Sequence, residues 1–312
     1  MPIPEALRGR LALPAIAAPM FLVSGPDLVV ETCRAGVLGT FPALNQRSTE
    51  GYGDWLAEIR ERTGNDAAPY GVNLIVHRSN ARLQQDLAET VRQRVPVIIT
   101  SLGAVQEVVD AIHSYGGLVF HDVINLRHAR KAAEAGVDGL IAVTAGAGGH
   151  AGTYNPFAFL HEIRQFFAGT LILSGGMSTG AHIAGARAAG ADLAYLGTRF
   201  IATTESRAPE DYKRMVLAAT AKDIVYTPAI SGVNANFLRP SIEAAGLDPD
   251  NLPDYGRDVA PGNHERRAWK NIWSAGHGVG AIEDVPSTAE LCARLKREYR
   301  QAIEGLAADL AA

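Results

Sequence analysis

The sequence predicts an α/β fold in which eight parallel strands and the helices between them close into a (β/α)8 barrel, the TIM-barrel architecture. Short apolar runs alternate with amphipathic stretches along the first two thirds of the chain, and there are eight such runs. Each run is apolar at consecutive positions, as in strands buried on both faces, and eight strands are the number that closes a barrel. An open, doubly wound sheet would show the same alternation and is the alternative.

The strands and helices follow one another in a regular order. The predicted strands are residues 14–19, 37–40, 70–76, 96–100, 118–123, 139–144, 170–174 and 192–197. The predicted helices between them are residues 26–35, 49–62, 80–92, 105–114, 126–135, 156–167 and 181–189. Turns such as Ala135-Gly136 end these helices, because glycine readily adopts the left-handed conformation of a helix C-cap.

The alternation ends at about residue 200, which suggests a division of the chain. We expect a barrel over residues 1–205, an appended region of mixed helix and loop over 206–286, and a C-terminal helix over 287–312 that packs back on the barrel. The pair Ser287 and Glu290 has the spacing of a capping box and marks the start of that helix. Active sites of such barrels lie at the C-terminal ends of the strands. The appended, mostly helical region is therefore expected to cover that face as a lid.

Composition excludes several classes of partner. The chain has 312 residues, 47% of them hydrophobic, and a net charge of -4 without a basic block interleaved with aromatic residues. Nucleic acid and anionic membranes are therefore not expected partners. Cys33 and Cys292 lie far apart in helical patterns, which favours buried reduced thiols over a disulfide. No signal-peptide pattern or membrane-length apolar run is present, so a cytoplasmic location is expected.

Two glycine-rich turns predict a phosphate site. Ser174-Gly175-Gly176 follows the seventh predicted strand, and Gly197-Thr198 follows the eighth. In (β/α)8 barrels the loops after these two strands offer backbone N–H groups and a helix N-terminus to a phosphate. One Ser-Gly-Gly turn is also typical of an ordinary tight turn, but two at adjacent strand ends favour the phosphate interpretation.

The loop after the sixth strand predicts a catalytic base. It places His150 among glycines that include Gly148 and Gly149, so the backbone could pass close to a flat ligand. Histidine is the only side chain in this loop that exchanges a proton near neutral pH. The alternative is that His150 only bonds a carbonyl or caps a helix. The chain has no His-Glu-x-x-His motif, clustered cysteines or paired carboxylates at ligand spacing, so no metal site is predicted.

These motifs together resemble the nitronate monooxygenase family, formerly called 2-nitropropane dioxygenases. The resemblance spans most of the chain in order: Ala-Pro-Met at 18–20, Gly-Val-Asn at 71–73, Gly-Gly-His-Ala-Gly at 148–152, the two phosphate turns, and Ile-Trp-Ser-Ala-Gly at 272–276. It implies an FMN-dependent TIM barrel with a smaller, partly helical domain. NAD(P)H:quinone reductases and flavin-dependent enoyl-acyl-carrier-protein reductases share the same motifs.

The resemblance assigns roles to individual residues. His150 matches the catalytic histidine of the family. The residues implied to bind the cofactor are Pro19, Met20, Phe21, Asn73, Asp122, Gly148, Gly149, Ser174, Gly175, Gly176, Gly197 and Thr198. Those implied for the lid and substrate are Trp273, Ser274 and His277. At the end of strand five several relatives have a lysine where this chain has Asp122, and the tyrosine-rich pocket of the well-defined bacterial class is not evident.

The implied activity is the oxidation of alkyl nitronates, or of nitroalkanes, with O2 to a carbonyl compound and nitrite. His150 would take the α-proton of a neutral nitroalkane. The expected partners are a small-molecule substrate and O2, and the sequence leaves a homodimer open. Two alternatives remain: an NAD(P)H-dependent flavin reductase acting on a quinone or an enoyl thioester, and a non-redox phosphate-binding barrel.

Overall fold

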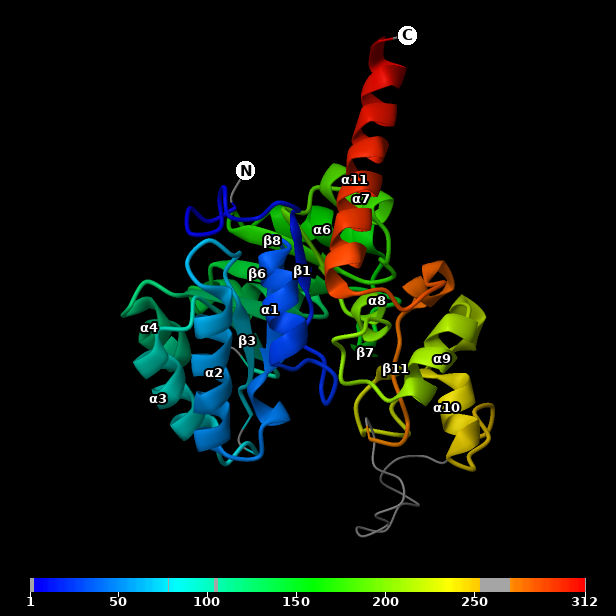
Figure 1. Cartoon of the computed structure of the whole chain (residues 1–312), viewed down its shortest axis with the longest axis horizontal. Coiled ribbons are helices and arrows are strands. Elements are labelled where there is room, and N and C mark those ends of the chain that lie inside the picture. Colours follow the sequence, from blue (N-terminus) through cyan, green and yellow to red (C-terminus); the bar gives the residue numbers. More distant parts are fainter. Residues whose placement is uncertain (1–2, 78, 104–105, 253–269, 312) are drawn as a thin grey trace.

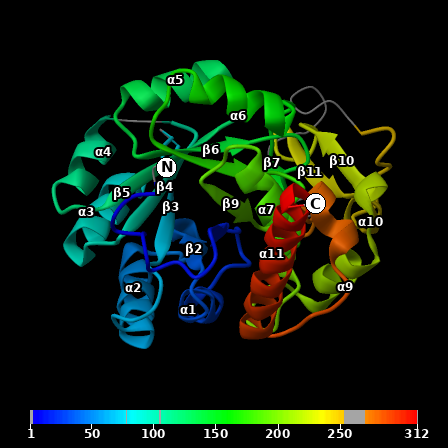
Figure 2. The ribbon, with the colours of Figure 1, turned by 90° about the horizontal axis from the view of Figure 1, so that it is seen from above.

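A closed parallel barrel forms the centre of the molecule (Figures 1 and 2). The computed structural model describes residues 3–77, 79–103, 106–252 and 270–311. The strand order is β1-β2-β3-β4-β5-β6-β8-β9, and β9 pairs with β1 to close the barrel. The eight strands are β1 Ala15–Ala17, β2 Leu38–Pro42, β3 Gly71–Ile75, β4 Val97–Ser101, β5 Leu118–Val123, β6 Gly139–Val143, β8 Thr170–Ser174 and β9 Leu193–Leu196. The predicted (β/α)8 barrel is confirmed, and the open sheet is excluded. Strand β1 is shorter than predicted, and Pro14, directly before it, has no N–H for the ladder.

The helices of the barrel form an outer ring around the strands (Figure 2). They are α1 Pro26–Arg34, α2 Thr49–Thr63, α3 Leu83–Gln93, α4 Gln106–His113, α5 Leu126–Glu134, α6 Pro156–Arg164, α7 Gly180–Ala188 and α8 Thr198–Ile201. Several begin at a side chain that accepts a hydrogen bond from the first turn, as Ser48, Asn125, Asn155 and Thr179 do. Such caps satisfy backbone N–H groups that have no partner within the helix. The expected start of α4 at residue 105 lies outside the described residues.

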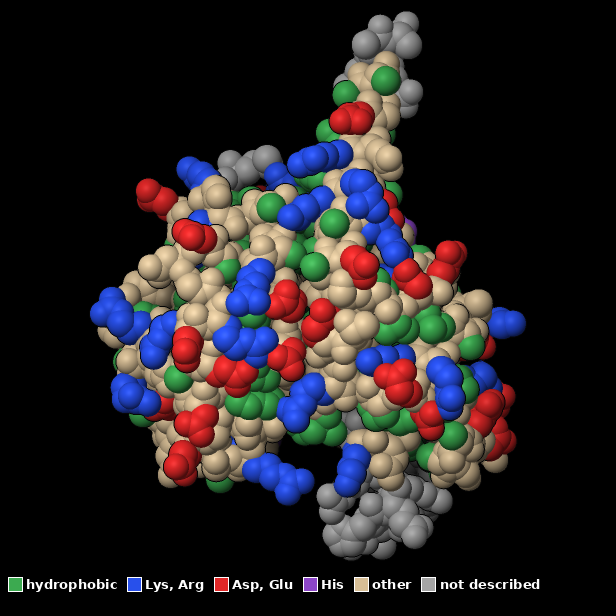
Figure 3. Space-filling view, in the orientation of Figure 1, with side chains coloured by type: hydrophobic (Ala, Val, Ile, Leu, Met, Phe, Trp, Pro, Cys, Tyr) green, Lys and Arg blue, Asp and Glu red, His purple; other side chains and the backbone are tan. Residues whose placement is uncertain are grey.

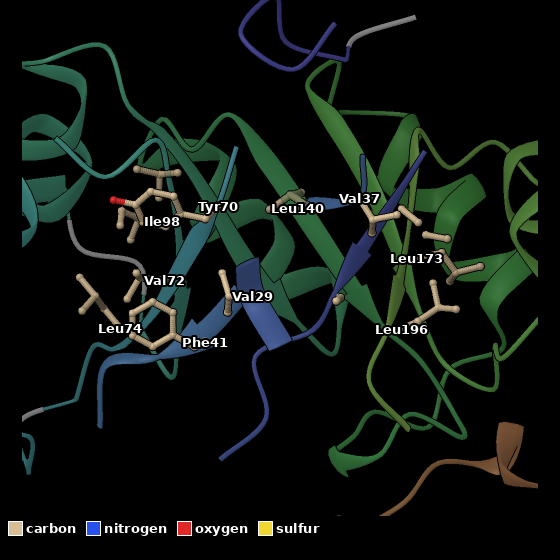
Figure 4. Packing of buried hydrophobic residues seen from close by; sticks show 14 of the residues in the cluster. Val29, Val37, Phe41, Tyr70, Val72, Leu74, Ile98, Leu140, Leu173 and Leu196 are labelled. Atoms are coloured by element: carbon tan, nitrogen blue, oxygen red, sulfur yellow. The ribbon is translucent and has the colours of Figure 1, made fainter. Parts of the chain in front are cut away.

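Buried side chains pack in two layers, one on each side of the strands. Val97 and Ile99 of β4 face the barrel interior, whereas Ile98 faces the helices, in the layer shown in Figure 4. This alternation explains why the strands are apolar at consecutive positions. It also sets the direction of polar residues near the strand ends. Asn73 lies between two outward-facing residues, Val72 and Leu74, so its side chain faces the barrel interior.

Two strands of the appended region form a small antiparallel sheet with a short strand from the loop after β6, which the sequence did not predict. Strands β7 Gly149–His150, β10 Ile224–Thr227 and β11 Ala235–Leu238 pair in the order β10-β11-β7. The region also holds helices α9 Glu210–Ala218 and α10 Arg239–Ala244 and the 3-10 helix His277–Ala281. Residues 253–269 of the expected lid lie outside the described residues. The domain limits at residues 205 and 286 stay predictions.

The C-terminal helix, α11 Thr288–Ala311, lies beside α7 and α1 (Figures 1 and 2). The contact with α7 is close, because a Cβ on Gly180 would stand 2.2 Å from the carbonyl oxygen of Leu295. The Ser287 N–H donates to the Glu290 carboxylate at 2.9 Å, as the capping-box pattern predicts. Cys33 and Cys292 are buried free thiols, and burial raises the pKa of each to about 12.

The outer surface carries mixed charge. In the face shown by Figure 3, lysines and arginines are interspersed with acidic side chains over both the barrel and the appended region. No helix among the described residues is both long and apolar enough to cross a membrane.

Candidate active site

A cavity of about 1280 Å³ opens at the C-terminal ends of the barrel strands. Ordinary ligand pockets are about 300–1,000 Å³, so this one can hold a cofactor together with a substrate. Its lining includes every predicted site residue except Trp273 and His277. The cavity has two sides of different origin. We call the inward-facing Asn73, Ser101, Asp122, Ser174 and Tyr195 the barrel wall. We call the second set the appended wall, in which His150 and Tyr154 of the loop after β6 join Tyr226, Asn234 and Ser274 of the appended region.

A hydrogen-bonded chain crosses three strands of the barrel wall. The Asn73 amide donates to the carbonyl of Ile99 at 3.1 Å and to Ser101 Oγ at 2.7 Å. The Ser101 hydroxyl then donates to Asp122 Oδ2 at 2.5 Å. Both amide hydrogens of Asn73 are therefore used within the protein, and its carbonyl oxygen is the group left for a ligand. This restricts the predicted contact of Asn73 with a cofactor to hydrogen-bond acceptance.

Asp122 is the one carboxylate on the described part of the cavity lining. Its Oδ1 is buried without a hydrogen-bond partner. Burial raises the pKa of Asp122 to about 6, against the lowering effect of the Ser101 hydrogen bond. Loss of water disfavours the charged form of an acid, and no cation on the described part of the chain offsets that loss.

The predicted phosphate turns lie together at another side of the cavity. Gly175 has φ +142° and Gly176 has φ +65°, backbone conformations that favour glycine. A Cβ on Gly175 would stand 2.3 Å from Thr144 Oγ1, so the turn also packs too closely for a side chain. The Gly176 N–H donates to the Gly146 carbonyl at 3.2 Å, a long bond that already uses this amide. Thr198 Oγ1 accepts from the Gly276 N–H at 2.9 Å, which leaves the threonine hydroxyl free to donate.

The first strand contributes the segment of Pro19, Met20 and Phe21 to the cavity mouth. Its backbone is fixed by Asn45, whose amide donates to the Met20 carbonyl at 3.1 Å. Met20 lies beside the phosphate turns, because a Cβ on Gly197 would be 3.8 Å from Met20 Sδ. Phe21 is 43% exposed, so its ring has an open face at the mouth.

His150 lies on the appended wall, in the two-residue strand β7. It pairs with Ala235 of β11, and the Gly149 N–H before it donates to Ser274 Oγ at 2.6 Å. The His150 side chain has exposed surface but stands among the walls of the cavity, and this loss of water lowers its pKa below the usual 6.5. Its imidazole is therefore neutral at pH 7 and able to accept a proton.

The glycines around His150 have a packing role that the sequence did not predict. A Cβ on Gly148 would lie 3.0 Å from the Gly276 nitrogen, and one on Gly146 would lie 2.9 Å from His277 Nδ1. Gly146 and Gly149 also have φ values of +83° and +74°. These glycines allow the loop to pack against the turn at residues 276–278. The close approach is thus between two backbone segments, in addition to any approach to a ligand.

Two of the three predicted lid residues do not line the cavity. Trp273 stacks on Tyr212 with ring centroids 5.0 Å apart, and it is Tyr212 that reaches the cavity. The exposed His277 packs over Gly146. Ser274 alone lines the cavity, where its hydroxyl accepts from Gly149 and donates to the Asn236 carbonyl at 2.6 Å. Trp273 and His277 therefore support the wall from behind.

Four tyrosines on the cavity lining were missed. No tyrosine-rich pocket is evident in the sequence, yet the cavity is lined by Tyr154, Tyr195, Tyr212 and Tyr226. Tyr195 could have been found, because it occupies an inward position of β9. The others are far apart in sequence and meet only in the fold. Tyr226 donates to the Ala151 carbonyl at 3.1 Å and so connects β10 with the His150 loop.

The fold and the cavity define this chain as a barrel enzyme with room for a cofactor and a small-molecule substrate. The family model described as nitronate monooxygenase matches residues 79–298, and the chain belongs to that family. The chain is accordingly an oxidoreductase. Membership of an oxidoreductase family argues against the alternative of a non-redox phosphate-binding barrel.

Individual relatives agree with this assignment. The chain is 31% identical to a nitronate monooxygenase of Paraburkholderia phytofirmans, over 94% of each protein. It is 30% identical to a (3aS,4S,5R,7aS)-5-hydroxy-7a-methyl-1-oxo-octahydro-1H-indene-4-carboxyl-CoA dehydrogenase of Rhodococcus jostii, over 73% of this chain and 63% of that one. The structure of a nitroalkane oxidase from Streptomyces ansochromogenes superposes with a TM-score of 0.80 at 26% identity, covering 96% of this chain and 100% of that one.

Proposed function

We propose that this protein is an FMN-dependent nitronate monooxygenase that oxidises alkyl nitronates with O2 to a carbonyl compound and nitrite. Family membership and the similarity to a nitronate monooxygenase and a nitroalkane oxidase support this proposal. Within the structure, the observation that carries it is the neutral His150 on a wall of a cavity large enough for a cofactor.

The residues of the cavity fit a flavin mononucleotide. The two glycine turns leave room for a phosphate: a Cβ on Gly176 would meet no atom within 4 Å, so this turn borders open space. Thr198 and Ser174 bring hydroxyl groups to the same place. Met20 and the barrel wall supply apolar and polar surface for a ring. Ser174, Gly175, Gly176, Gly197 and Thr198 would hold the phosphate, and Asn73 would accept a hydrogen bond from the ring.

The chain's own contribution to catalysis is proton transfer and orientation. When bound, FMN supplies the electron acceptor for the oxidation. His150 accepts the α-proton of a neutral nitroalkane, and the resulting imidazolium then attracts the nitronate anion. A general base of this kind accelerates a reaction by about 10²–10⁴-fold. The pairing of β7 with β11 fixes the backbone of His150, so the imidazole is held on one wall of the cavity.

An anaerobic mixing experiment tests the function. The purified protein, reconstituted with FMN, is mixed with propyl-2-nitronate, and separately with NADH and NADPH, while the flavin absorbance is followed. Bleaching by the nitronate, with nitrite formed after oxygen is admitted, is the expected result. Bleaching only by reduced nicotinamide contradicts the proposal and restores the flavin reductase alternative. Failure to retain FMN contradicts both.

A further inference from the structure

Only one oxygen of the Asp122 carboxyl group has a hydrogen-bond partner. Oδ2 accepts the Ser101 hydroxyl at 2.5 Å, whereas Oδ1 is buried without a partner. A buried carboxylate oxygen that has no donor makes the charged form costly, and a protonated carboxyl avoids most of that cost. The position of Asp122 at the cavity wall therefore favours a neutral acid once water leaves the cavity.

No cation among the described residues acts measurably on the Asp122 carboxyl: Arg127 and Lys131 also line the cavity, but their charges act on His128, and that of Lys131 on His121 as well, and neither is among the causes of the Asp122 pKa shift. Across the barrel wall Asp122 faces Asn73 from β3, Ser101 from β4 and Tyr195 from β9, and its ladder neighbour on β6 is Ile141. The pKa of Tyr195 is raised by burial and, in second place, by the charge of Asp122. The adjacent His121 faces the other side of the strand, where its Nδ1 lies 2.7 Å from Thr100 Oγ1. Burial lowers the pKa of His121 to about 4, so this imidazole is neutral and does not balance a carboxylate.

The protonation state of Asp122 decides what Ser101 offers to the cavity. When Asp122 is ionised, the Ser101 hydrogen is used by Oδ2. When Oδ2 carries a proton, it donates to Ser101 Oγ, which also accepts from the Asn73 amide. Both lone pairs of Ser101 are then occupied, and its own hydrogen turns to the cavity. A proton on Asp122 thus converts Ser101 from a group without a free donor into a donor.

We propose that Asp122 takes up a proton when a flavin ring occupies the cavity, so that Asp122 and Ser101 present the ring with a hydrogen-bond donor instead of an anion. The inference rests on the cofactor part of the proposed function and not on its substrate. A flat ring displaces water from the barrel wall, which adds to the desolvation that already disfavours the carboxylate. Asp122 acts through Ser101 and is a positioning residue.

Flavin affinity as a function of pH tests this inference. Riboflavin is used beside FMN, because it lacks the phosphate group, whose own second pKa of about 6 would also affect binding. The dissociation constant is measured by quenching of flavin fluorescence between pH 6 and pH 8.5. A proton taken up on binding weakens riboflavin affinity by up to about tenfold for each pH unit above the pKa of the free protein. Calorimetry of the wild type in two buffers of different ionisation enthalpy should report the same uptake and needs no variant.

The variant Asp122→Asn tests whether Asp122 acts through its proton or only through the shape of its side chain. The amide has the shape of the acid and no charge, so the variant should bind riboflavin at all pH values about as tightly as the wild type does at pH 6. His150→Asn is the matched control, since it removes another titratable group of the lining and should leave the uptake unchanged. Ser101→Ala should weaken binding, and its effect should not add to that of Asp122→Asn.

Each outcome has one meaning. Proton uptake in the wild type and pH-independent binding by Asp122→Asn support the inference. Wild-type affinity that does not change with pH, or an unchanged pH slope in Asp122→Asn, overturns it while FMN dependence stands. Failure of the wild type to bind either flavin overturns this inference and the proposed function together.

Discussion

The two walls of the cavity are built on different principles. On the barrel wall, the alternation of each strand decides that Asn73, Ser101 and Asp122 face inward, and neighbouring strands bring them into one hydrogen-bonded chain. On the appended wall, His150 depends on contacts between segments far apart in sequence, such as the bond from Gly149 to Ser274. The barrel wall thus follows from the pattern of the strands, whereas the appended wall depends on how the loop after β6 packs against the appended region.

The largest effect is expected from replacing His150 of the appended wall, which should change nitroalkane turnover without changing FMN affinity. Under the proposed function His150 is the base, so His150→Asn should lower kcat/KM for a neutral nitroalkane by about 10²–10⁴-fold. Turnover of a preformed nitronate, which has no α-proton to lose, should fall far less. Steady-state nitrite formation measures both, and the FMN dissociation constant serves as the control. Equal losses on the two substrates would show that His150 does not act as a base.

The barrel wall could be predicted from sequence more fully than the appended wall. Eight apolar runs predicted the barrel. The positions of Asn73 and Ser174 on or at the end of predicted strands made them candidate site residues. The alternation of inward-facing residues along β4 and β9 would also have predicted that Ser101 and Tyr195 face the barrel interior. The direction of the Asn73 amide could not be foreseen, because it depends on the Ile99 carbonyl across the ladder.

The appended wall could not be predicted because its signals are short and its contacts are distant. Strand β7 has two residues, and its partner β11 comes much later in the chain. The glycine-rich setting pointed to His150 in the sequence, but it did not reveal that those glycines also pack against the turn at 276–278. Trp273 and His277 were placed in the lid from sequence, while the fold puts them behind the wall.

The next effect concerns the backbone contact that holds the appended wall. A Cβ on Gly276 would be 2.4 Å from the Gly146 oxygen and 2.8 Å from the Gly148 nitrogen. Because backbone must shift, Gly276→Ala should lower the free energy of unfolding by about 1–3 kcal/mol and weaken nitroalkane turnover. Gly185→Ala in α7 is the control. Its Cβ would meet no atom within 4 Å, so urea unfolding should show a gain of about 0.5–1 kcal/mol. Equal stability of the two variants would contradict the claim that residue 276 packs too closely on Gly146 and Gly148 to carry a side chain.

A smaller effect is expected at Ser274, whose hydroxyl connects the His150 loop to β11. Ser274→Ala leaves the Gly149 N–H and the Asn236 carbonyl without this partner, at a cost of about 1–2 kcal/mol in unfolding free energy. Ser114→Ala removes an exposed hydroxyl on another helix end and should change little. Both are measured by urea unfolding. A Ser274→Ala protein as stable as Ser114→Ala would mean that this connection is dispensable.

The smallest effect is expected at Tyr226. Tyr226→Phe removes the hydrogen bond to Ala151 but keeps the ring, so we expect a loss of about 0.5–1 kcal/mol in thermal unfolding. The nitroalkane KM should rise more than kcat falls, because the loop that carries His150 loses one tether. Tyr299→Phe is the matched control, since its hydroxyl makes no hydrogen bond with the described residues. A change in FMN affinity without a change in KM would contradict this, because it would mean that Tyr226 affects cofactor binding and not the His150 loop.

The pH dependence of wild-type turnover tests the central claim, that a neutral His150 on the appended wall removes the substrate proton. Desolvation lowers the pKa of His150, so its basic form persists from neutral pH to below 6.5 and is lost only as the pH falls through that lowered value. We predict that kcat/KM for a neutral nitroalkane is constant at neutral pH and then falls about tenfold per pH unit on the acid side, while a preformed nitronate does not follow this decline. The same acid decline for both substrates, or none for the nitroalkane, would contradict the account.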